Sequence, residues 1–181
     1  AKAAVRLRLS GLAVPEVEPM AGIHEMLRVL DAEYLTDGLA SLREIPSASV
    51  DFVWSQSVLQ HIRRSEFRET MAEVRRVLRP GGVCSHSVDL KDCLGGALNN
   101  LRFSPRIWEN DFVAGSGFYT NRIRFAEMQD IWRSVGFAPE VISTSEWTHL
   151  VTPRRRLAPE FRHLPEGELL VSNFEVILRA V

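Results

Sequence analysis

Residues 65–88 constrain the fold more than any other part of the sequence, because they predict a helix, a sharp break and a strand in succession. Ser65 is a candidate N-cap, and apolar residues recur at helical spacing at Phe67, Met71, Val74 and Leu78. Pro80-Gly81-Gly82 ends the helix, and residues 83–88 follow as a strand. We therefore expect the apolar stripe of this helix to pack against a sheet.

The rest of the chain alternates between helical and extended patterns. Residues 1–9 read as the tail of a helix, and a further helix is predicted over residues 21–30. Apolar spacing predicts another helix over residues 125–135, which Gly136 ends. Strands are expected at residues 32–36, 50–54, 141–144 and 171–181. This alternation favours an α/β sheet wrapped by helices.

Composition excludes several classes of protein. The chain has 181 residues and a net charge of −1, which suits one domain and not a basic nucleic-acid surface. Its apolar runs are far shorter than the ~18 residues that span a bilayer, and its start does not resemble a secretory signal. The two cysteines, Cys84 and Cys93, provide no disulfide framework. A cytoplasmic protein without membrane span or nucleic-acid partner is expected.

The segment over residues 90–122 is irregular and too long for a passive connector. We expect it to hold short helices or to cover a site. It is rich in hydrogen-bonding and aromatic side chains, at Asn99, Asn100, Trp108, Tyr119, Asn121 and Arg122. The alternative is a segment packed by its own apolar residues with a solvated exterior.

Three sequence motifs resemble the second half of a class I S-adenosylmethionine-dependent methyltransferase. They are Ser49-Val-Asp-Phe-Val-Trp-Ser55, then Val58-Leu-Gln-His-Ile62, and a helix that closes on Val77-Leu-Arg-Pro-Gly-Gly82. Val135-Gly136-Phe137 resembles a further segment of that family. The resemblance covers roughly residues 30–181. It implies a Rossmann-like sheet with flanking helices and a C-terminal antiparallel strand, in a single, partial methyltransferase domain with residues 90–122 as a lid on the substrate side.

The resemblance also implies where the cofactor, S-adenosylmethionine, is held. Asp37, Gly38 and Leu39 match positions near the adenine, although an ordinary Asp-Gly turn explains them equally well. Ser55 and Gln56 follow a strand at the end where α/β sheets place ligands. His61 matches the histidine of the family motif, and a purely structural role is the competing interpretation.

Candidate catalytic residues are His61, His86 and Tyr119, although methyl transfer requires no invariant catalytic group. We expect His86 and Asp89 to line the substrate side of the sheet edge. Cys84, His86, Asp89 and Cys93 bear metal-binding atoms, but no second close ligand pair exists and no metal is expected.

The sequence departs from the family pattern at its start. Residues 1–30 contain no acidic residue followed by G-x-G-x-G, the loop that holds the methionine half of the cofactor in that family. We therefore expect the N-terminal strands and an upstream portion to be missing. Two functions stay open: methyl transfer to an unidentified acceptor, or a non-catalytic methyltransferase-like interaction module.

Overall fold

The computed structural model describes residues 22–181, so the helix expected over residues 1–9 lies outside the described part. Contacts divide the chain into two compact units, residues 1–41 and residues 42–181. Each unit is described here by itself.

The described part of the first unit contains one helix and the start of another. The helix α2 (Ile23–Val29) confirms the helix expected over residues 21–30, and α3 (Leu39–Glu44) begins at the end of the unit. The strand predicted over residues 32–36 is wrong, because this segment belongs to no sheet. A strand needs a hydrogen-bonded neighbour, and propensity alone does not supply one.

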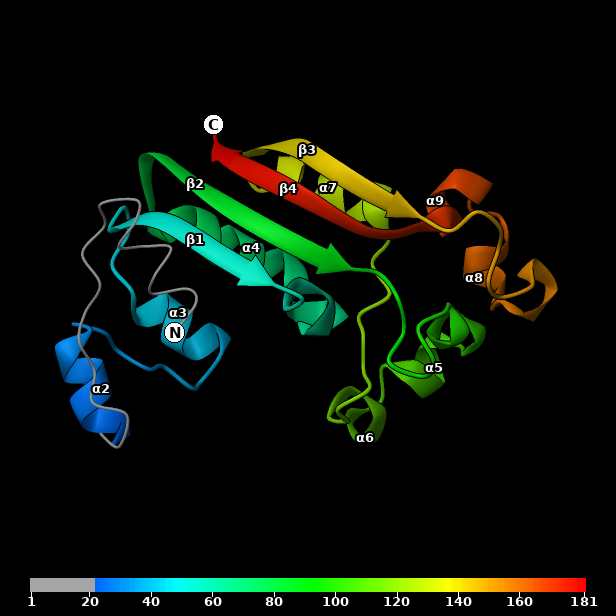
Figure 1. The fold of residues 1–181 in the computed structure, drawn as a ribbon, viewed down its shortest axis with the longest axis horizontal. Coiled ribbons are helices and arrows are strands. Elements are labelled where there is room, and N and C mark those ends of the chain that lie inside the picture. Colours follow the sequence, from blue (N-terminus) through cyan, green and yellow to red (C-terminus); the bar gives the residue numbers. More distant parts are fainter. Residues whose placement is uncertain (1–21) are drawn as a thin grey trace, which may run out of the picture. The chain divides into compact units, whose positions relative to one another are not determined.

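The second unit is built on a four-stranded sheet of order β1-β2-β4-β3. Its strands are β1 (Val50–Gln56), β2 (Leu78–Asp89), β3 (Phe137–Glu146) and β4 (Val171–Ala180). β1 and β2 are parallel, and β4 runs antiparallel to both β2 and β3. This α/β sheet with flanking helices and an antiparallel C-terminal strand confirms the predicted fold class (Figure 1).

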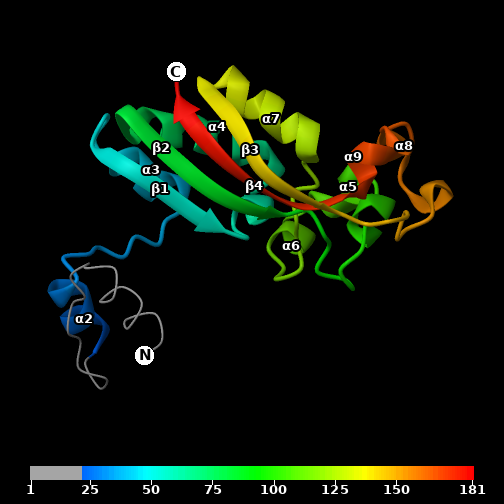
Figure 2. The same cartoon turned by 45° about the horizontal axis from the view of Figure 1, so that its top comes forward.

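Two helices, α4 (Arg64–Val77) and α7 (Phe125–Ser134), cover one face of this sheet (Figures 1 and 2). Phe67, Met71, Val74 and Leu78 are all buried in one cluster, which confirms the face predicted from their spacing. From the strands, this cluster receives alternate residues at Cys84, Val88, Phe174, Val176 and Leu178. The helices and the sheet therefore share one main core.

The start of α4 differs from the prediction that Ser65 is its N-cap. The helix begins at Arg64, Arg63 occupies the N-cap position, and Ser65 lies inside the first turn. The backbone N–H of Arg64 instead donates to the hydroxyl of Tyr119, 3.1 Å away. A tertiary contact thus satisfies a helix-end donor that the local sequence was expected to cap.

The structure differs from the prediction that Pro80-Gly81-Gly82 separates the helix from the strand, because these residues lie inside the strand β2. β2 already begins at Leu78, which pairs with Val50, and the register then shifts before Phe52 pairs with Val83. Gly81 has a φ of +80°, and a Cβ on Gly82 would lie 3.0 Å from the carbonyl oxygen of Arg79. The two glycines therefore permit a bulge inside the strand where a simple helix-to-strand break was expected.

The segment over residues 90–122 holds short helices, as expected. They are η2 (Asn99–Arg102), α5 (Pro105–Trp108) and α6 (Asp111–Ala114). Leu98 and Leu101 join a second, smaller core with the segment that carries η3 (Arg154–Arg156), α8 (Pro159–Arg162) and α9 (Glu166–Leu170). Ile107 and Phe112 are exposed. Tyr119, Asn121 and Arg122 are buried as well, so the insert is buried near both of its ends and exposes apolar side chains in its middle.

Within the described residues, no helix combines the length and the apolar character needed to cross a lipid bilayer.

Shortening a buried side chain of α4 should destabilise the protein. Met71 is fully buried, so Met71→Ala should lower the free energy of unfolding by about 2–4 kcal/mol through lost burial and a residual cavity. Glu69, on the exposed side of the same helix, forms an ion pair with the exposed Arg43. Glu69→Ala is the matched control and should cost less than about 1 kcal/mol. Urea unfolding measures both, and equal losses would contradict the assigned face.

Candidate functional site

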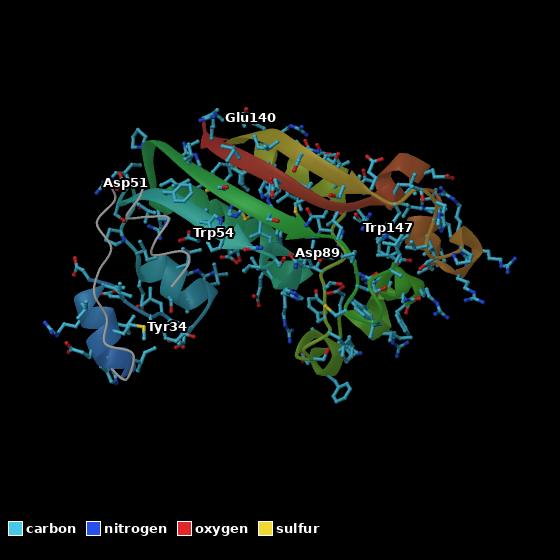
Figure 3. All side chains as sticks on the ribbon, viewed as in Figure 1. Tyr34, Asp51, Trp54, Asp89, Glu140 and Trp147 are labelled. Atoms are coloured by element: carbon cyan, nitrogen blue, oxygen red, sulfur yellow. The ribbon has the colours of Figure 1, made fainter. Side chains whose placement is uncertain are left out.

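The carboxyl ends of the parallel strands β1 and β2 lie at the same edge of the sheet. Open α/β sheets place their ligands at this edge. After β1 the chain turns at Ser57, whose φ of +54° is left-handed and whose N–H donates to the carbonyl of Ser87 at 2.9 Å. The turn leads into the short helix η1 (Leu59–His61). Figure 3 shows Asp89 where β2 ends and Trp54 on β1.

Ser55 and His86 form a hydrogen-bonded pair across the two strands. The Ser55 Oγ lies 2.7 Å from His86 Nδ1, and only 3% of His86 is exposed. Burial lowers the pKa of His86 to about 4, so the imidazole is neutral at neutral pH. Its Nε2 has no hydrogen-bond partner in the described part of the chain. The pair ties together the ends of β1 and β2.

The expected place of His86 on the substrate side of the sheet edge stays a prediction. In the structure, His86 is buried near the end of β2. It shares its strand face with Cys84 and Val88, which belong to the core under the helices. Burial also raises the pKa of the Cys84 thiol to about 12, which makes the thiol a packing group. Asp89 does lie at the end of β2, half-exposed, where it accepts from the N–H of Lys91. No group of three potential metal ligands occurs between residues 22 and 181.

His61 and Tyr119 lie together at the junction of η1 and the insert. The His61 Nδ1 is 2.8 Å from the Tyr119 carbonyl oxygen, which can only accept, so Nδ1 carries the proton. The exposed imidazole thus retains Nε2 as an acceptor. The Tyr119 hydroxyl donates to Glu109 Oε2 at 2.7 Å, and burial raises the pKa of Tyr119 to about 12. Tyr119 therefore stays protonated and serves as an anchor.

Asp37, Gly38 and Leu39 lie in the first unit, at the start of α3. The N–H of Asp37 donates to Ser41 Oγ at 3.0 Å, and Gly38 has a φ of +55°. These features are those of a turn that leads into a helix. Asp37 is exposed, so its carboxylate is accessible to a ligand.

The insert is tied to η1 by Asn121. Its side-chain amide donates to the carbonyls of Leu59 and Ile62, at 2.9 and 3.0 Å. Its backbone N–H donates to the carbonyl of Gln60 at 2.7 Å. This clamp closes one side of a narrow cleft between η1, the end of β2 and the insert, lined chiefly by Gln60, Asp89, Lys91, Asn100, Arg122 and Arg124.

Among the chief cleft residues, sequence analysis singled out Asp89, Asn100 and Arg122 but missed Gln60, Lys91 and Arg124. Gln60 lies inside the Val58–Ile62 motif, one residue before His61. Arg124 lies two residues after Arg122, and its burial depends on carbonyls of Leu90 and Val171, which are distant in sequence. Sequence alone does not distinguish a buried arginine from a surface arginine, because the difference depends on such distant contacts.

Comparison with known proteins agrees with this architecture. Residues 12–85 match the sequence model of a family described as "Methyltransferase domain". A SAM-dependent methyltransferase from Methanosarcina mazei superposes with a TM-score of 0.52 at 16% identity, over 100% of this chain and 79% of that chain. Another from Archaeoglobus fulgidus gives a TM-score of 0.50 at 10% identity, over 98% and 80%. No curated protein sequence matches significantly.

The chain thus has the fold of the class I S-adenosylmethionine-dependent methyltransferases, the family that its motifs resemble.

Acid should destabilise the protein through His86. The pKa of this group is about 4 in the folded protein and near 6.5 in an unfolded chain. Between these values the unfolded chain binds a proton that the folded chain does not, so stability falls as pH is lowered from 6.5 toward 4. The loss should approach roughly 3 kcal/mol.

Urea unfolding at several pH values measures this dependence in the wild type and in His86→Gln. The variant should lack this part of the pH dependence, whereas His163→Gln, at an exposed position, should retain it. Identical pH profiles for the wild type and His86→Gln would refute the assignment.

Proposed function

We propose that the protein transfers a methyl group from S-adenosylmethionine to an acceptor. The observation that carries this proposal is the match of residues 12–85 to a methyltransferase domain. The matched region contains β1, η1 and α4 and ends inside β2. It therefore includes Ser55, Gln56 and His61 but not the insert over residues 90–122. When bound, S-adenosylmethionine supplies an electrophilic methyl group on its sulfonium.

Part of the cofactor's recognition can come from described residues. In the second unit, Gln56 is exposed at the end of β1, and His61 offers a free Nε2. Ser55 is bonded to His86, which leaves chiefly its backbone for a ligand. In the first unit, the exposed Asp37 carboxylate suits hydroxyl or amino donors, and Gly38 with Leu39 offers backbone at the same turn. Taken separately, each of the two sets offers groups that match the polar adenosine half of the cofactor.

The protein's contribution to the reaction would be alignment and exclusion of water. The insert over residues 90–122, anchored through Tyr119 and Asn121, is proposed to cover the acceptor as a lid. His61 is the proposed proton acceptor where the methyl acceptor must lose a proton, because its Nε2 is free and exposed. His86 acts through Ser55 as a positioning residue.

The sequence also favours a second candidate function, a non-catalytic interaction module. Residues 1–181 contain no G-x-G-x-G motif that would hold the methionine half of the cofactor. A module of this kind would keep the core and the sheet edge described above but would bind no S-adenosylmethionine.

Removing the charge of Asp37 should weaken cofactor binding. A lost hydrogen bond to a charged group costs about 1.5–3 kcal/mol, so Asp37→Asn should lower S-adenosylmethionine affinity roughly ten- to a hundredfold. Asp31→Asn is the matched control in the same unit, because Asp31 has a φ of +49° that asparagine also tolerates. Titration calorimetry measures the affinities.

The titration should be run on residues 1–181. Binding together with transfer of a labelled methyl group supports the proposed function. Absence of S-adenosylmethionine binding overturns it in favour of the interaction module. Equal loss of affinity in Asp31→Asn and Asp37→Asn would remove Asp37 from the cofactor site.

A further inference from the structure

Four buried side chains around the cleft each leave one polar atom without a hydrogen-bond partner among residues 22–181. They are Gln60 Oε1, Asn100 Oδ1, Arg122 Nε and Arg124 Nε. The residues are only 5%, 2%, 4% and 3% exposed. An unpaired buried polar atom costs about 1–3 kcal/mol, so four at one place point to a group that belongs there.

The charge of the cleft wall is predominantly positive. Lys91, Arg122 and Arg124 face a single acidic lining residue, Asp89, which pairs with Lys91 at 3.2 Å. The Arg122 guanidinium donates to Glu109 at 3.1 Å and to the carbonyl of Phe103. The charge of Arg122 is thus partly balanced from outside the cleft.

Arg124 has no such hydrogen-bonded carboxylate. Its terminal nitrogens donate to backbone carbonyls of Leu90, Glu168 and Val171. The Glu168 carboxylate accepts a hydrogen bond from the N–H of Ala126 and interacts with the Arg124 guanidinium only through longer-range electrostatic attraction. Burial lowers the pKa of Arg124 to about 10, which still leaves it charged at neutral pH. Arg124 is therefore a buried cation that would gain from an anionic ligand.

Arg122 is held rigidly at the cleft. Its guanidinium carbon lies 5.7 Å from the ring centroid of Trp108 and 5.3 Å from that of Phe161. The backbone of Arg122 has a φ of +59°, a left-handed conformation that costs energy for a residue with a side chain. Strain of this kind persists where the surrounding structure enforces it, and such positions cluster at ligand sites.

We infer that this cleft binds a carboxylate of the methyl acceptor between Arg122 and Arg124, with Gln60 and Asn100 taking a donor on the neighbouring carbon. The acceptor class is therefore a small amino or hydroxy acid. The role assigned to this ligand rests on the proposed methyl transfer. The cleft itself lies at the end of β2 and beside η1, at the sheet edge where α/β folds bind ligands.

Size and chemistry select this class. The enclosed part of the cleft has room for about one water-sized group, so it takes only the head of a small ligand, and the rest of the ligand lies toward the open side. Two unpaired N–H donors match two carboxylate oxygens, and two amide oxygens match an amino or hydroxyl donor. Asp89 and Lys91, the half-exposed members of the lining, form its mouth. The competing occupant is ordered water.

Acetate is the probe for the carboxylate, and its binding requires no S-adenosylmethionine. The Nε–H resonances of Arg122 and Arg124 in nitrogen-15 spectra report on the cleft directly. Acetate should shift both resonances saturably, whereas acetamide at the same concentration should not. Inorganic phosphate is titrated as a third ligand. Chloride keeps the ionic strength the same in all titrations.

The substitution Gln60→Glu tests whether acetate binds in this cleft. The Gln60 side chain forms no hydrogen bond with other described residues. The nearly isosteric change to Glu therefore breaks no described hydrogen bond. A carboxylate at position 60 competes with acetate for the two arginines, and acetate affinity should fall at least tenfold. Gln129→Glu, on α7 and outside the cleft lining, makes the same change in charge and should keep the wild-type affinity.

Three results would overturn the inference. Linear, non-saturating shifts with acetate would mean that the cleft holds water. Tighter binding of phosphate than of acetate would overturn the choice of a carboxylate. Equal loss of acetate affinity in Gln60→Glu and Gln129→Glu would place the anion elsewhere.

Transfer of a labelled methyl group to small amino and hydroxy acids, compared with their amides, separates this inference from the proposed function. Preference for the acids supports both. Equal transfer to acids and amides leaves the proposed function standing and overturns the acceptor class. Saturable acetate binding without transfer to any acceptor overturns the proposed function, while the anion site stands.

Discussion

The packing of α4 across β1 and β2 is the interaction on which the described second unit depends. The helix connects two parallel strands and buries one apolar stripe, so the same contacts that remove Phe67 and Met71 from water bring the carboxyl ends of both strands to one edge. Ser55 and His86 meet there because their strands are in register. The core therefore determines where polar chemistry can be assembled.

The polar edge in turn depends on the insert. Asn121 holds the insert to η1, and the Tyr119 hydroxyl accepts from the first N–H of α4. These contacts exclude water from the side chains of Arg122 and Arg124, which strengthens any electrostatic interaction that they make. The buried polar atoms that remain unpaired lower the stability of the fold. Unpaired buried atoms of this kind are common in ligand-binding regions.

The candidate site was only partly predictable from sequence. Asn100, Tyr119 and Arg122 are polar or aromatic residues in a long irregular segment, and the sequence singles them out for that reason. Cys84, His86 and Val88 alternate with serines and so share a strand face, and this pattern already places His86 beside core residues. Arg124 carries no local signal, because the carbonyls that bury it come from two other segments.

The sequence by itself determined the elements whose apolar spacing is strong: the stripe of α4, the extent of α7 with Gly136 after it, and the alternation along β4. It also carried the motifs of the methyltransferase fold, since these are local strings of residues. Only the tertiary structure decided which extended segments become strands, because residues 32–36 have strand-like composition but no ladder partner. The same holds for the cap of α4, the bulge in β2 and the cleft with two buried arginines, since each depends on hydrogen bonds between residues far apart in the chain.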